Sequence, residues 1–160
     1  MKIGLAIREL HRSEKSLARA LLKAADRHHV EHEIHYVAKD LAAWSADHIR
    51  DLAVAGRRYG VKVGEEMPRS SGLLEPLRTA FSVLTGRQAV PGVLLLADLR
   101  QLHRMAAGVS LDWELLAQGA QAVKDSELVE LTRRCHPETL RQLKWTNAML
   151  KTLSPQVLAS

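Results

Sequence analysis

The feature that most constrains the fold is a recurring apolar stripe with a helical period. The first stripe has one position filled by a glutamate, and its members are Ile3, Ile7, Leu10, Glu14, Leu17, Leu21 and Ala24. Side chains spaced three and four residues apart lie on one face of an α-helix, and such a face packs against other elements. The stripe therefore predicts a core-facing helix over about residues 3–27 that carries one carboxylate.

Three further stripes of the same period follow along the chain. They predict helices over about residues 31–59, 92–123 and 126–153. Strand-type alternation is absent, so we expect an all-α chain. The connections inside the first and the last pair of helices are short, which forces each pair to lie antiparallel. Pro137 falls inside the last helix and predicts either a kink or the start of a new helix there.

A longer segment separates the two helix pairs. Residues 60–71, GVKVGEEMPRSS, have the glycine, proline and serine content of a loop. Ser71, at the end of this loop, is a suitable N-cap for a short amphipathic helix over about residues 72–85. The expected fold is one domain over residues 1–160, an up-down four-helix bundle of two antiparallel hairpins with a long crossover that carries this extra helix.

Composition narrows the possible functions. The net charge of +5 permits attraction to nucleic acid, but acidic residues are interspersed along the chain. No glycine-rich phosphate loop is present, and aromatic residues make up only 4% of the chain. The single cysteine, Cys135, excludes an intramolecular disulfide and a multi-cysteine zinc site. No uncharged apolar run reaches the length of a membrane span, so we expect a cytoplasmic protein without membrane association.

Three of the four stripes carry one ionisable residue each, namely Glu14, His48 and Glu138. Counting from the first turn places Glu14 level with Trp44, and His48 then lies about 5 Å away, one helical turn. The same count from the second turn places Glu138 level with Asp112 and Trp113. The polar core layer predicted in this way consists of Glu14, Trp44, Trp113 and Glu138, with His48 nearby and Gln142 on the same stripe as Glu138.

Two segments resemble helices of a known superfamily. LHRSEKSLARALLKAA, which contains Glu14, and LAAWSADHIRDLA, which contains His48, are similar to the first and second helices of ferritin-like proteins, in particular the rubrerythrin and YciF-type stress-protein branch. The resemblance implies a ferritin-like four-helix bundle, with Glu14 and His48 at metal-ligand positions. It further implies iron or another divalent metal as cofactor, and a metal-dependent oxidoreductase or iron-handling stress protein as the function.

The chain departs from the ferritin-like ligand pattern. A di-iron site of that kind takes one glutamate from each of two helices and a Glu-x-x-His pair from each of the other two. Here Ser45 stands three residues before His48, and Arg141 stands three residues after Glu138. Two indole rings would also fill the volume that two metal ions require. The favoured interpretation is therefore a remnant metal site, made of Glu14, His48 and Glu138, with no cofactor.

Three interpretations of Glu14 and Glu138 stay open. They could lean to solvent or pair with an arginine, they could be buried with His48 as the charged partner, or they could bind metal. In the third case Asp112 and Glu114, which flank the third stripe, could replace missing ligands if that helix were rotated.

Another group of candidate ligands lies in HHVEHEIH, where His28, His32 and His35 stand four and three residues apart. The chain is expected to turn within this segment, which scatters the side chains. The group is either a solvated hairpin tip or an adventitious zinc or nickel site.

The function favoured by the sequence is that of a ferritin-like bundle that has lost its di-iron centre. Its role would then be in interaction, structure or regulation, with a protein partner or a second copy of the chain, and it would not be an enzyme. The alternatives are a di-iron or single-metal oxidoreductase or iron-handling protein, and a basic DNA-associated stress protein suggested by net charge alone.

Overall fold

Four long α-helices make up most of the residues that the computed structural model describes, which are 2–67 and 90–160. The helices are α1 (Ile3–Arg27), α2 (His32–Gly56), α4 (Pro91–Ala122) and α5 (Ser126–Leu158), and a 3-10 turn, η1 (Arg57–Tyr59), follows α2. The predicted all-α fold with two helical hairpins is confirmed. The short helix predicted over about residues 72–85 lies outside the described residues.

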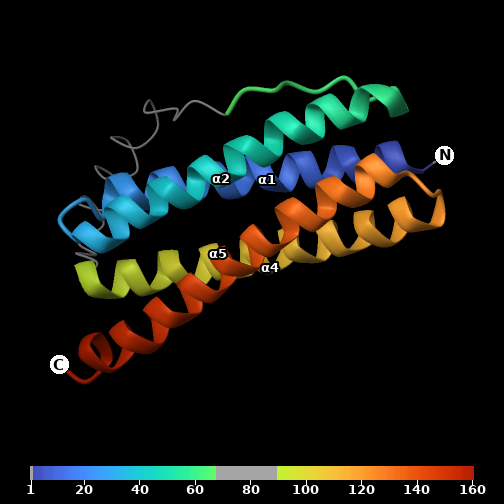
Figure 1. Cartoon of the computed structure of the whole chain (residues 1–160). Coiled ribbons are helices and arrows are strands. Elements are labelled where there is room, and N and C mark those ends of the chain that lie inside the picture. Colours follow the sequence, from blue (N-terminus) through green and yellow to red (C-terminus); the bar gives the residue numbers. More distant parts are fainter. Residues whose placement is uncertain (1, 68–89) are drawn as a thin grey trace.

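The two hairpins pack side by side to form the bundle (Figure 1). Helices α1 and α2 form the first hairpin, and α4 and α5 form the second. Between the hairpins, Ser13 Oγ donates a hydrogen bond to Asp112, and Arg27 donates to Asp98. Because the partner number on α4 falls as the number on α1 rises, these two helices run antiparallel.

The helix ends show why the chain turns where it does. Asp125 is the N-cap of α5, and its side chain accepts a hydrogen bond of 3.1 Å from the backbone N–H of Leu128. Helix α5 then runs unbroken through Pro137, so no new helix starts there. Pro137 has no N–H to donate to the carbonyl of Arg133 one turn earlier, which weakens the helix locally.

The apolar stripes of α1 and α4 are buried almost as predicted. Every member of the α1 stripe is buried, including Glu14. On α4 the stripe is buried at Leu95, Leu99, Leu102, Ala106, Val109, Trp113, Leu116 and Ala120. On α5 the core side also contains Thr132 and Thr146. Their hydroxyls donate to carbonyls of their own helix, Val129 at 2.7 Å and Leu143 at 2.8 Å, so their burial leaves no unpaired hydroxyl proton.

None of the helices in residues 2–67 and 90–160 combines the length and the apolar character that crossing a bilayer requires.

Candidate functional site

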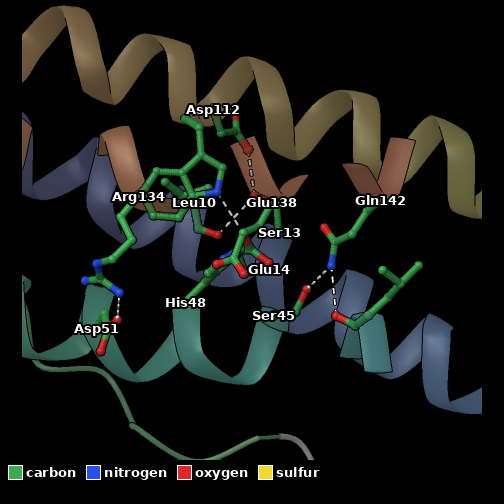
Figure 2. Close-up of polar contacts among 12 residues, drawn as sticks. Leu10, Ser13, Glu14, Ser45, His48, Asp51, Asp112, Arg134, Glu138 and Gln142 are labelled. Atoms are coloured by element: carbon green, nitrogen blue, oxygen red, sulfur yellow. Dashed lines mark hydrogen bonds and ion pairs between the residues drawn. The ribbon is translucent and has the colours of Figure 1, made fainter. Parts of the chain in front are cut away.

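A polar network lies in the middle of the bundle, and each of the four long helices contributes one side chain to it (Figure 2). Glu14 comes from α1, His48 from α2, Trp113 from α4 and Glu138 from α5. Glu14 and Trp113 are fully buried, and His48 is 1% exposed. The network therefore ties both hairpins together inside the core.

His48 bridges the two carboxylates through its two ring nitrogens. Nδ1 lies 2.8 Å from Glu14 Oε1, and Nε2 lies 3.1 Å from Glu138 Oε1. An ionised carboxylate only accepts hydrogen bonds, so each ring nitrogen facing one must carry a proton. Both nitrogens are protonated only in the imidazolium form. The geometry thus indicates a positively charged His48 between two negatively charged side chains.

The electrostatics of His48 point in the same direction. Burial alone disfavours the charged ring, but the hydrogen bonds and charges of Glu14 and then Glu138 outweigh it and raise the pKa of His48 above its usual value of 6.5. The ring also meets Trp113 edge to face, with centroids 5.6 Å apart and planes at 82°. Indole packing on one side therefore fixes the plane in which His48 donates its hydrogen bonds.

The two ends of the network differ. Glu14 Oε1 accepts from Trp113 Nε1 at 2.8 Å as well as from His48. Its second oxygen, Oε2, is buried and has no hydrogen-bond partner among the described residues. The side chain of Glu138 is 27% exposed, so water reaches that end. The Glu14 carboxylate consequently depends on His48 and Trp113 for its stabilisation, whereas Glu138 is partly solvated.

A second polar contact lies one turn further along α5. Gln142 Nε2 donates to the carbonyl of Leu41 at 2.9 Å and lies 3.0 Å from Ser45 Oγ, both on α2. Trp44, which the sequence placed in the polar layer, is half-buried and packs against the edge of the hydrophobic core. Its neighbour Ser45 takes the inward position. Polar contacts thus join α2 to α5 at two successive heights.

The donor set does not fit a ferritin-like di-iron centre. Both nitrogens of His48 already face carboxylates, and the inward group of α4 is the Trp113 N–H, which donates and cannot bind a cation. Asp112 accepts from Ser13 at 2.6 Å, and Glu114 is 55% exposed. In the described residues no group of three or more His, Cys, Asp or Glu side chains is arranged to hold a metal ion.

The histidines of the first hairpin turn are separated. His28 is buried and its Nε2 donates to Asp98 at 2.7 Å, which links α1 to α4. His35 Nδ1 donates to the carbonyl of Ala25 at 2.8 Å, and His32 is exposed. Metal binding by these three residues stays a prediction, and His28 would have to bind through Nδ1 as long as its Nε2 contacts Asp98.

Cys135 is a buried free thiol on the core side of α5. Burial raises its pKa to about 12, and the neighbouring Arg134 does not offset that effect. The thiolate is the nucleophilic form of cysteine, so a thiol with this pKa is unreactive at neutral pH. Cys135 is therefore a packing residue on the core side of α5.

Comparisons with protein-family models, with curated proteins and with solved structures found no match to this chain. The fold and the site together define an all-α four-helix bundle with a buried Glu–His–Glu network at its centre.

Proposed function

We propose that this chain is a ferritin-like bundle in which an internal ion pair has replaced the di-iron centre, and that it acts by interaction rather than by catalysis. The observation that carries the proposal is the position of His48, whose two nitrogens each face a carboxylate. Glu14 and His48 are also the residues at which the sequence resembles ferritin-like ligands. The imidazolium supplies between the two acids the positive charge that metal ions would otherwise supply.

The network also supports a scaffold role. It joins α1, α2, α4 and α5 at one height, so the four helices cannot slide past each other without breaking a buried hydrogen bond. Buried polar contacts of this kind are known to specify helix register in some bundles, at some cost in stability. A bundle held in one register presents constant outer faces, which is what a protein with an interaction role needs.

Iron loading tests the loss of the metal centre. Protein purified without an affinity-tag nickel step is titrated anaerobically with ferrous iron, exposed to oxygen and analysed for bound iron and for iron–oxo absorption. We expect no stoichiometric binding and no such absorption, with the same result for Glu14→Gln. Two irons per wild-type chain that are lost in the Glu14→Gln variant would contradict the proposal and favour the metal-dependent oxidoreductase predicted as the alternative.

A further inference from the structure

An apolar groove lies on the outer face between α1 and α4, away from the buried network. Its volume is about 850 Å³, and its apolar walls are formed by Leu5, Ala6, Met105, Val109, Leu111 and Leu115. All three leucines in these walls are strongly exposed: Leu5 at 58%, Leu111 at 67% and Leu115 at 68%. Contiguous exposed apolar surface of this kind marks an interaction site.

The shape of this face has both a ridge and a hollow. Leu111 and Leu115 are four residues apart on α4 and form a ridge along it. Beside the ridge, Gly108 also lines the groove, and a side chain added there would meet no atom within 4 Å. Ridges of side chains pack into the grooves of neighbouring helices. A surface that carries both can pair with itself, the ridge of each copy entering the hollow of the other.

The charges on the rim of the groove have the same self-complementary character. Glu9 and Arg12 both line it from α1, 60% and 69% exposed, and form an ion pair of 3.2 Å with each other. Because α1 and α4 are antiparallel, the Ser13–Asp112 hydrogen bond places Arg12 at about the height of residue 113, between Leu111 and Leu115. A two-fold axis passing between Glu9 and Arg12 would bring Glu9 of one copy opposite Arg12 of the other, twice per interface, beside the two leucine ridges.

We propose that the α1–α4 groove is the interface of a symmetric dimer of this chain. The proposal rests on the interaction role proposed above, and it is independent of how the buried network is charged. The two-fold contact buries the Leu5, Leu111 and Leu115 side chains and exchanges the exposed Glu9–Arg12 pairs within each chain for pairs between chains.

Sedimentation velocity over a wide concentration range tests this interface. We expect wild type to dimerise and Leu111→Glu and Leu115→Glu each to weaken dimerisation at least about 100-fold, because a carboxylate would be buried among leucines. Leu140→Glu is the matched control, since Leu140 is 47% exposed on α5 and does not line the groove. Circular dichroism confirms that each variant is folded. Unchanged dimerisation in both groove variants would overturn the proposal.

Charge reversal tests the two-fold register. Glu9→Arg alone places arginine opposite Arg12 of the partner, and Arg12→Glu alone places glutamate opposite Glu9, so each single variant is expected to dimerise more weakly. Mixing the two variants restores both attractive pairs and is expected to restore dimerisation. A mixture no stronger than either variant would overturn this pairing. Wild type that stays monomeric would overturn the proposal, and the iron-loading result would still decide the proposed loss of the metal centre.

Discussion

Two histidine–carboxylate clusters in this molecule are arranged in opposite ways, one with a base between two acids and the other with an acid between two bases. In the middle of the bundle, the basic side chain of His48 lies between two acids, Glu14 and Glu138. At the hairpin end, the acid Asp98 lies between two basic side chains, His28 at 2.7 Å and Arg27 at 3.0 Å. In the first cluster the His48 and Glu14 side chains are 1% and 0% exposed and water reaches only Glu138, whereas the side chains of Asp98 and Arg27 are 24% and 31% exposed.

This difference in burial decides how much each cluster matters to folding. Breaking a buried ion pair leaves a charge that water cannot solvate, whereas breaking a partly exposed pair lets water replace the lost partner. The same chemistry therefore has a large effect at His48 and a small one at Asp98.

The largest effect is expected from His48→Leu. This substitution leaves Glu14 buried with Trp113 as its remaining hydrogen-bond donor, so the free energy of unfolding should fall by about 3–5 kcal/mol. Urea denaturation measures the change. The double variant His48→Leu with Glu14→Gln should recover part of the loss, because it removes the unpaired charge. A loss below about 1 kcal/mol in the single variant would show that Glu14 is not ionised in the core.

Trp113→Phe is expected to cause the second-largest loss in the free energy of unfolding. It keeps an aromatic ring in the core but removes the N–H that donates to Glu14 at 2.8 Å, and it should cost about 1–3 kcal/mol. Trp44→Phe is the matched control, since Trp44 is half-buried at the edge of the core. Equal losses in the two variants would mean that indole size, and not the hydrogen bond to Glu14, accounts for the effect.

The pH dependence of stability separates the two clusters without removing a side chain. The pKa of His48 is raised, so its contribution is complete below pH 6.5 and is lost as pH rises through the folded pKa. For Asp98, burial would raise the pKa, but His28 and Arg27 together lower it below 3.8. Its contribution is therefore present above pH 3.8 and lost as pH falls through the lowered value.

Urea denaturation across this pH range measures both effects. His48→Gln should remove the loss of stability at high pH and keep the loss at low pH. Asp98→Asn should keep the loss of stability at high pH and remove the loss at low pH. A single variant that removes both declines would show that the two clusters titrate as one unit.

The smallest effect is expected from Asp98→Asn at neutral pH. Asp98 and its partner Arg27 are partly solvated, so the free energy of unfolding should fall by only about 1 kcal/mol. Thermal or urea denaturation beside His48→Leu gives the comparison directly. A loss as large as that of the His48 variant would contradict the argument that burial decides the difference.

Much of the fold was predictable because the apolar stripes of α1 and α4 satisfy the helical period at almost every position. The contact between Glu14 and His48 was underestimated, since counting from the turn left one helical turn between them. Side chains lean toward the N-terminus of their helix. In an antiparallel hairpin Glu14 therefore leans away from the turn and His48 leans toward it, which closes the gap to 2.8 Å.

Other parts of the site could not be read from the sequence. The ion pair of His28 with Asp98 depends on how α1 and α4 are placed against each other, and no local pattern records that register. Trp44 was predicted to face inward because it falls on the helical period of the second stripe, yet Ser45 faces inward and contacts Gln142. A small polar residue next to a tryptophan gives no periodic signal. The difference is local, because Leu41, His48 and Leu52 of the same helix are buried.

The protonation state of His48 decides whether a cation lies between Glu14 and Glu138 in the core. Nitrogen-15 NMR of the histidine rings distinguishes the imidazolium from the two neutral tautomers, and His48→Gln assigns its signals. We predict that at pH 7 both ring nitrogens of His48 carry protons and that the ring titrates above its usual pKa of 6.5. A neutral His48 ring at pH 7, or one whose nitrogen signals shift on stoichiometric binding of a divalent metal, would contradict the account.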